Sequence, residues 1–244
     1  MIYWLADVMD EMPLGDEGIS PSFLSTTEET VYRGLRFAKR RRDWLLGRRT
    51  AKQLLRRSVI AYSNLPLTEI TVANDPDGAP YYCVNGQRLS FCLSISHREG
   101  RALCALSGTH TIGADVERIE PRAPAFVEDF FTDRENELVH AASPADRDLL
   151  ITLIWSAKES VLKVLRQGLR IDTTRIEICD KDLQNFSSNI KETHNVLWHP
   201  LYVDCLMSAA PPLVAWWRLD GNDVLTLAAA IPARSHERLA ICAV

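Results

Sequence analysis

The chain has 244 residues, enough to form one large globular domain or two small ones. Apolar residues make up 46% and charged residues 25%, which is typical of globular proteins and excludes the disordered and collagen-like classes. The net charge is −4, no run approaches the ~18 apolar residues of a membrane-spanning helix, and the acidic N-terminus does not resemble a signal peptide. We therefore expect a cytoplasmic protein that does not enter a membrane.

Basic residues are concentrated between Arg33 and Arg57. This segment holds eleven lysines and arginines and a single acid, Asp43, in a chain that is acidic overall. A positive segment of this kind attracts a nucleotide phosphate, a nucleic acid or an acidic partner protein. The alternative is a solvated helix face, and charge alone does not decide between the two.

Strand and helix patterns alternate along the first half of the chain. Residues 2–8 are rich in β-branched and aromatic residues and predict a strand. Residues 27–62 carry apolar side chains near helical spacing and predict helices. A turn at 75–80 and the pair Asn85-Gly86 indicate hairpins, and two short strands are expected around Gly108.

The second half repeats this order. Residues 123–166 have a helical pattern, and strand patterns follow at 176–179, 197–206, 213–219 and 224–231. An α+β fold with two similar halves, residues 1–110 and 111–244, is therefore predicted.

The six cysteines lie at widely separated positions and form no CxxC motif, which excludes a zinc ribbon or a thioredoxin-like site. Most lie in apolar runs, where a thiol behaves as a small buried side chain. Disulfides are rare in cytosolic proteins, so we expect thiols at positions 83, 92, 104, 179, 205 and 242.

Two acids follow each other closely in the segment Gly113-Ala114-Asp115-Val116-Glu117. Because strand side chains alternate between faces, Asp115 and Glu117 project to the same side and Val116 to the other. Two close carboxylates repel each other unless a cation lies between them, and their hard oxygens suit Mg²⁺ or Mn²⁺ better than zinc. The alternative is a solvated strand end.

A second candidate site lies in the helical segment that starts at Trp155. Trp155, Glu159 and Lys163 are spaced at i, i+4 and i+8 and so share one stripe of the helix, which Lys158 borders. Such a stripe suits the wall of a site. The alternative is a buried tryptophan followed by an exposed Glu–Lys pair.

A third candidate is the sequence Ser94-Ile95-Ser96-His97, which ends an apolar strand where the chain turns at Arg98-Glu99-Gly100. A histidine beside a hydroxyl at a strand end can donate hydrogen bonds to phosphate oxygens. A lone histidine is more often structural, so this motif is weak by itself.

Together and in this order the motifs resemble those of the surfactin-type 4′-phosphopantetheinyl transferases. The resemblance covers residues 33–170 and rests on SISH (94–97), GADVE (113–117), FFTDRE (130–135), WSAKESVLK (155–163) and QGL (167–169), with WLLGRRTAKQLL (44–55) and GAP (78–80) upstream. It implies a pseudo-dimer of two similar α+β halves with the active site in the cleft between them. The N-terminal half would take the 3′-phosphate side of coenzyme A, and the C-terminal half the metal and the catalytic helix.

The resemblance also implies an activity of the holo-[acyl-carrier-protein] synthase type. The enzyme would move the phosphopantetheine arm of coenzyme A, its substrate, onto a serine of an apo acyl or peptidyl carrier protein. It would release 3′,5′-ADP and depend on Mg²⁺, with Mn²⁺ as an alternative. The expected partners are coenzyme A and the carrier protein, with no nucleic acid or membrane, and we expect a monomer.

Site residues follow from the resemblance by position. The expected metal ligands are Asp115, Glu117 and Glu159. The expected catalytic residues are Glu159 as general base, Lys163 at the departing phosphate, and His97. The expected residues that bind the cofactor are Arg33, Arg48, Pro80, Ser96, His97, Lys158 and Lys163.

Three positions depart from the family pattern. Ala79 stands where a lysine usually precedes the proline, which removes one expected phosphate contact. Arg98 replaces a small hydroxyl residue, and Val116 offers no polar group between the two acids. The adenosine end of the coenzyme A site is therefore less well defined by the sequence than the metal end.

Two other functions are open to these residues. Carboxylates, lysines and a basic helix also suit a metal-dependent nuclease. The basic segment alone would suit a module that binds nucleic acid or an acidic protein without catalysis. The Trp-Ser-Ala-Lys-Glu helix and the Ser-His strand end favour the transferase over both.

Overall fold

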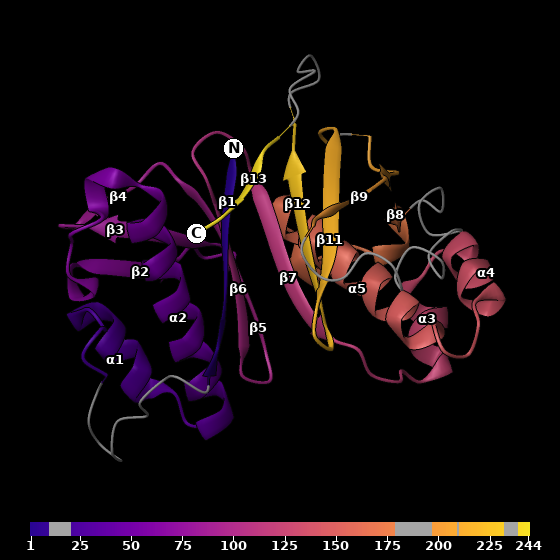
Figure 1. The fold of residues 1–244 in the computed structure, drawn as a ribbon, viewed down its shortest axis with the longest axis horizontal. Coiled ribbons are helices and arrows are strands. Elements are labelled where there is room, and N and C mark those ends of the chain that lie inside the picture. The colour runs from indigo at the N-terminus through magenta and orange to yellow at the C-terminus, as the bar shows by residue number, and fades with distance from the viewer. Residues whose placement is uncertain (10–20, 179–196, 209, 232–238) are drawn as a thin grey trace. The chain divides into compact units, whose positions relative to one another are not determined.

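The computed structural model describes residues 1–9, 21–178, 197–208, 210–231 and 239–244 (Figure 1). The chain divides into two compact units, Met1–Thr109 with Arg238–Val244, and His110–Glu237. Both units combine helices and sheets, so the predicted α+β class is confirmed. Within the described ranges, no helix is both long and apolar enough to cross a membrane.

The first unit is built on a four-stranded sheet and a smaller three-stranded one. The main sheet has the order β13 (Ile241–Ala243), β1 (Ile2–Val8), β6 (Arg101–Ser107) and β5 (Cys92–Arg98). The smaller sheet contains β2 (Ile70–Asn74), β3 (Pro80–Val84) and β4 (Gln87–Arg88). Strand β13 pairs in parallel with β1, so these C-terminal residues join the first unit, whereas the sequence grouped them with the second half.

Two helices accompany these sheets, α1 (Thr26–Gly34) and α2 (Ala38–Ser58), with short 3-10 turns at Ile60–Tyr62 and Leu67–Glu69. The predicted helical stretch is therefore interrupted at residues 35–37. Helix α2 packs on β1, β5 and β6 and buries Leu46, Ala51 and Leu55. The sequence pattern located this apolar face correctly but did not locate the break.

Tight turns connect the strands where the sequence predicted them. Asn85 and Gly86 have φ of 51° and 76° and join β3 to β4, as expected for an Asn-Gly hairpin. Glu99 and Gly100 have φ of 47° and 79° and join β5 to β6. The strand after the Asn-Gly turn is only Gln87–Arg88, and β5 pairs with β6 instead.

The second unit contains a four-stranded antiparallel sheet and a two-stranded one. The larger sheet has the order β7 (Ile112–Arg118), β12 (Asp223–Ala230), β11 (Leu213–Asp220) and β9 (His199–Leu201). The smaller sheet pairs β10 (Val203–Cys205) with β8 (Ile176–Ile178). The strands predicted at 213–219 and 224–231 match to within a residue, and the one at 176–179 matches as far as residue 178, since residue 179 lies outside the described ranges. The single strand predicted at 197–206 is instead two short strands, β9 and β10, in different sheets. Gly221 (φ 63°) lies in the turn between β11 and β12.

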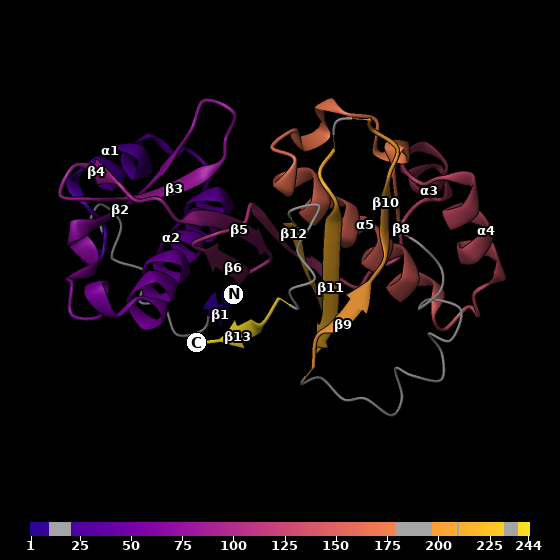
Figure 2. The same ribbon diagram turned by 90° about the horizontal axis from the view of Figure 1, so that it is seen from above.

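Helix α5 (Arg147–Val164) covers one face of the larger sheet, as Figures 1 and 2 both show. The other helices of this unit are α3 (Pro124–Phe130) and α4 (Asp133–Ala141), followed by 3-10 turns at Gly168–Arg170 and Thr173–Arg175. Helix α5 approaches β7 so closely that a β-carbon at Gly113 would lie 1.8 Å from the Ser160 carbonyl oxygen. Glycine at position 113 therefore lets the helix contact the strand.

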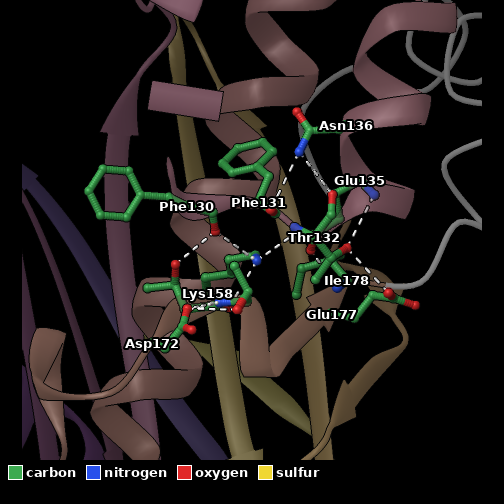
Figure 3. Close-up of polar contacts among 11 residues, drawn as sticks. Phe130, Phe131, Thr132, Glu135, Asn136, Lys158, Asp172, Glu177 and Ile178 are labelled. Atoms are coloured by element: carbon green, nitrogen blue, oxygen red, sulfur yellow. Dashed lines mark hydrogen bonds and ion pairs between the residues drawn. The ribbon is translucent and has the colours of Figure 1, made fainter. Parts of the chain in front are cut away.

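A buried ion pair fastens α5 to the start of α4. The side chains of Lys158 and Glu135 are fully buried, and their charged atoms lie 2.7 Å apart. Figure 3 shows Lys158 pointing toward this carboxylate and the Phe130 carbonyl oxygen, to which it donates at 3.1 Å. It also donates to the Thr173 carbonyl oxygen, and Glu135 accepts from the Ile178 amide. Burial lowers the pKa of Lys158 and raises that of Glu135.

The first unit contains the same arrangement. Lys52 of α2 is buried against Glu28, which caps α1 together with Ser25, just as Glu135 caps α4 together with Thr132. Lys52 donates to the carbonyl oxygens of Phe23 and Leu67, and Glu28 accepts from the Val72 amide, repeating each contact of the second unit. This repetition supports the predicted similarity of the two halves.

Candidate functional site

Asp115 lies at the centre of the polar contacts between β7 and α5. Its carboxylate is almost fully buried, accepts a hydrogen bond from Ser156 Oγ at 2.8 Å and forms an ion pair with Lys163 Nζ at 2.8 Å. Lys163 also donates to the Ala114 carbonyl oxygen at 2.8 Å. The strand acid and the helix lysine that the sequence singled out are thus in direct contact.

Glu159 stands one helical turn before Lys163 and is half-buried. Its pKa is raised above the usual range, first by burial and then by the negative charge of Asp115, while Lys163 lowers it. The two carboxylates are therefore close enough to repel each other. Two hard oxygen ligands in this relation fit a divalent cation, because the cation would relieve the repulsion.

Glu117 has a different partner. Its carboxylate lies 3.0 Å from the Arg122 guanidinium, which the sequence analysis did not identify, and Val116 between the two acids is buried. Among the residues that the structure describes, no three Asp, Glu, His or Cys side chains converge closely enough to form a metal site. To hold the expected cation together with Glu159, Asp115 would exchange its contact with Lys163, and Glu117 would exchange its contact with Arg122.

The other two residues of the helix motif belong to the core. Trp155 packs against the rings of Phe126 and Phe130, with centroids 4.9 and 5.3 Å away, so the structural alternative describes it correctly. The Lys158 ammonium is enclosed with Glu135. We therefore reassign Lys158 from the predicted cofactor-binding set to the internal ion pair, because its charge is used inside the fold.

Arg48 and the turn before Pro80 are brought together in the first unit. Arg48 Nη2 donates to Asn74 Oδ1 at 2.6 Å, and Asn74 Nδ2 donates to the Gly78 carbonyl oxygen at 2.6 Å. The Arg48 guanidinium also lies 4.8 Å from the Trp44 ring centroid. Asn74 connects the two predicted elements, and nothing in the sequence marked it.

One atom of Arg48 stands out chemically. Its side chain is 8% exposed, and its buried Nε has no hydrogen-bond partner among the residues described. Burial lowers the pKa of Arg48. A buried cation with an unused donor fits an anionic ligand such as a phosphate, because an unsatisfied buried donor is costly.

Ser96 and His97 lie at the end of β5, next to α2. Gly47 of α2 lies against this strand end, since a β-carbon there would be 3.1 Å from Ile95 Cγ2, a tight contact, and 3.5 Å from His97 Cδ2, an ordinary one. The His97 side chain is exposed and that of Ser96 half-buried. Both predicted residues thus lie beside the helix that carries Arg48.

Arg33 occupies a different environment, on the solvent side of α1. Its guanidinium is 72% exposed and contacts Glu29 at 3.2 Å, one turn earlier in the helix. Three other cations of the basic segment stabilise the fold itself: Arg48 through Asn74, Arg49 through Asp7 at 3.0 Å, and Lys52 through Glu28. The exposed lysines and arginines of the segment are Arg33, Arg36, Lys39, Arg40, Arg42 and Arg57, and four of these six lie at positions 36–42.

Comparisons with known proteins place part of the chain near one superfamily. Residues 111–205 match the family model of the 4′-phosphopantetheinyl transferase superfamily. The chain is 28% identical over 143 residues to the 4′-phosphopantetheinyl transferase gsp of Aneurinibacillus migulanus, covering 57% of each protein. It is 25% identical to the 4′-phosphopantetheinyl transferase HetI of Nostoc sp. over 54% of this chain and 55% of that protein.

A third relative is enterobactin synthase component D of Salmonella typhi, 31% identical over 60% of this chain and 59% of that protein. The chain thus spans little more than half the length of the curated relatives it matches. The superfamily match contains Asp115, Glu117, Glu159 and Lys163, whereas the upstream motifs SISH (94–97), GAP (78–80) and WLLGRRTAKQLL (44–55) lie outside it. The resemblance to surfactin-type 4′-phosphopantetheinyl transferases is therefore confirmed, and residues 111–205 carry the signature of that superfamily.

Proposed function

We propose that this protein transfers the 4′-phosphopantetheine arm of coenzyme A onto a serine of an apo acyl or peptidyl carrier protein. The observation that carries the proposal is the ion pair of Asp115 with Lys163, whose charges also act on the nearby Glu159, within the region that matches the superfamily. A carboxylate pair with an adjacent ammonium suits phosphoryl transfer, in which positioning and charge stabilisation dominate catalysis.

In the proposed reaction one bond to phosphorus forms and one bond to phosphorus breaks. The serine oxygen bonds to the β-phosphorus that carries pantetheine, and the bond from that phosphorus to the bridging oxygen breaks, so 3′,5′-ADP leaves. Glu159 accepts the serine proton, directly or through water, and its raised pKa suits a general base. Lys163 stabilises or protonates the departing phosphate.

Asp115, Glu159 and Glu117 would hold Mg²⁺ or Mn²⁺, with Glu117 exchanging its contact to Arg122. When bound, the cation would neutralise part of the negative charge of the pyrophosphate. The buried Asp115 keeps its two oxygens in fixed directions, one toward Ser156 and the other toward Lys163.

Residues of the first unit would bind the rest of coenzyme A. Arg48 is the stronger candidate for a phosphate contact, because it is buried and its Nε is unused, while Arg33 is exposed and paired with Glu29. Ser96 and His97 would donate to the pyrophosphate, and Pro80 shapes the turn beside Arg48. The active-site cleft between the halves stays a prediction, as do the monomeric state, the absence of nucleic acid and a cytoplasmic location.

The test is to incubate the protein with coenzyme A, Mg²⁺ and an apo carrier protein and to weigh the carrier by mass spectrometry. The proposal predicts a gain of one phosphopantetheine arm, and no gain when the carrier serine is replaced by alanine. A nuclease would leave the carrier unchanged and cleave a nucleic acid substrate. A binding module would retain the carrier without altering its mass.

A further inference from the structure

A buried chain of hydroxyl groups leads to Asp115 from the interior of the second unit. Ser156 Oγ of α5 lies 2.8 Å from Asp115 Oδ2, and Thr226 Oγ1 of β12 lies 2.9 Å from Ser156 Oγ. The Thr226 hydroxyl also lies 2.9 Å from the Ser156 carbonyl oxygen. Ser156 and Thr226 are fully buried, so water does not replace these contacts.

Proton counting fixes the direction of this chain. Each hydroxyl has one proton to donate, and an ionised carboxylate only accepts. Ser156 therefore gives its proton to Asp115, and the single Thr226 proton is shared between the Ser156 carbonyl oxygen and Ser156 Oγ. Thr226 thereby restrains the rotation of the Ser156 hydroxyl, which in turn restrains Asp115.

The first unit has an equivalent acid and an equivalent first hydroxyl but not the second hydroxyl. Thr50 precedes Lys52 by two residues, as Ser156 precedes Lys158, and Thr50 Oγ1 lies 3.3 Å from Asp7 of β1. Asp7 faces Ala102 in the next strand, whereas Asp115 faces Thr226, so the second hydroxyl is missing there. Asp7 is held instead by Arg49, through contacts of 3.0 and 3.3 Å.

Comparing the two units distinguishes the contacts that both share from those found in the second unit. Both units place an acid of the first sheet strand beside a hydroxyl of the long helix. A cation pairs with the acid in both units, Arg49 with Asp7 and Lys163 with Asp115, and the Thr50 hydroxyl also bonds the Leu46 carbonyl oxygen at 2.8 Å. Among the described residues, the second unit adds a second buried hydroxyl, that of Thr226, behind the one that contacts the acid, whereas the first unit forms the same strand and helix with Ala102 at that place.

We propose that Ser156 and Thr226 are positioning residues that fix the Asp115 carboxylate for a divalent cation. Hydrogen bonds of this kind orient a ligand oxygen, and their loss usually weakens metal binding by about 10- to 100-fold. The consequence for phosphopantetheine transfer rests on the proposed function, whereas the effect on cation binding does not.

The experiment measures Mn²⁺ binding to the full chain by electron paramagnetic resonance, without coenzyme A or carrier. Ser156→Ala is expected to weaken Mn²⁺ binding by about 10- to 100-fold, and Ser156→Thr to restore most of it. Thr226→Val keeps the side-chain shape and is expected to have a smaller effect in the same direction. The matched control is Thr50→Val, which removes the equivalent hydroxyl of the first unit and should leave Mn²⁺ affinity unchanged.

Thermal unfolding of each variant shows whether the fold is retained. Folded Ser156→Ala protein with wild-type Mn²⁺ affinity would overturn the proposal, and so would an equal loss in Thr50→Val or no Mn²⁺ binding by the wild type. If Ser156→Ala does not fold, Thr226→Val decides, and a folded Thr226→Val protein with wild-type Mn²⁺ affinity would overturn the proposal. If the Mn²⁺ pattern appears but no carrier is modified, the positioning role stands and the transferase proposal fails.

Discussion

Replacing Gly113 by alanine should separate α5 from β7. The added β-carbon would lie 1.8 Å from the Ser160 carbonyl oxygen and 2.8 Å from its carbon, both backbone atoms that no rotamer change can move. Ordinary contact begins at 3.4 Å, so the helix must retreat by about 1.6 Å, which in a packed core typically costs 1–3 kcal/mol. The retreat also stretches the contacts of Asp115 with Ser156 and Lys163, so we expect a loss of about 3 kcal/mol or more.

Urea unfolding followed by tryptophan fluorescence measures this loss. The control is Gly34→Ala at the end of α1, where nothing lies within 4 Å of the added β-carbon. That variant should stay within about 1 kcal/mol of wild type, because only the backbone preference of glycine changes. Gly113→Ala should in addition lose Mn²⁺ affinity, since Asp115 and Glu159 are no longer held together.

Wild-type stability in Gly113→Ala would refute this reasoning, because the close approach of helix and strand would then not exist. Equal losses in both glycine variants would also contradict it. In that case the cost would come from the loss of glycine itself and not from the backbone contact at Ser160.

Three further predictions concern the charges. Lys163→Ala should lower kcat for carrier modification more than it raises KM for coenzyme A, because the ammonium acts on the departing phosphate; an effect confined to KM would make it a ground-state contact. Lys158→Met should lower the free energy of unfolding by about 3–5 kcal/mol in urea titrations, because it leaves the buried Glu135 carboxylate without its cation. The double variant Lys158→Met with Glu135→Leu should recover most of that free energy. Replacing the exposed Arg40 and Arg42 together should raise the carrier KM and flatten its salt dependence in steady-state assays, while coenzyme A affinity stays the same; a loss of coenzyme A affinity alone would refute the steering role.

Arg41 is left out of that last variant because the structure gives it another task. Its Nε donates to the Leu35 carbonyl oxygen, and its guanidinium lies 5.8 Å from the Tyr32 ring centroid. It therefore holds the corner between α1 and α2. The sequence alone does not distinguish it from Arg40 and Arg42, because the contacts of three consecutive arginines depend on where the helix begins.

Short-range patterns were sufficient to identify the main features of the candidate site. Strand alternation selected Asp115, and helical spacing placed Glu159 and Lys163 on one stripe, where the structure shows them together. Helical spacing also placed Lys158 beside the stripe that begins at Trp155. Trp155 packs in the core. The motif suggested a ligand contact there, but packing decides where the side chain points.

Contacts between residues far apart in the chain could not be predicted from the sequence. Ser156 and Thr226 are 70 residues apart, and Arg48 and Asn74 are 26 apart, so no local period connects them. The parallel pairing of β13 with β1 joins the two ends of the chain in the same way. Aligning the two halves of the sequence on Lys52 and Lys158 pairs Thr50 with Ser156. This equivalence is the one sign in the sequence that Ser156 matters to the site.

The most direct test of the central claim compares wild-type protein with Asp115→Ala in the carrier-modification assay. With coenzyme A and Mg²⁺, the wild type should add one phosphopantetheine arm to an apo carrier, as seen by mass spectrometry, and folded Asp115→Ala should add none. An unmodified carrier with the wild type, using a carrier that another phosphopantetheinyl transferase modifies, would contradict the account. So would an equal rate of modification by the Asp115→Ala variant.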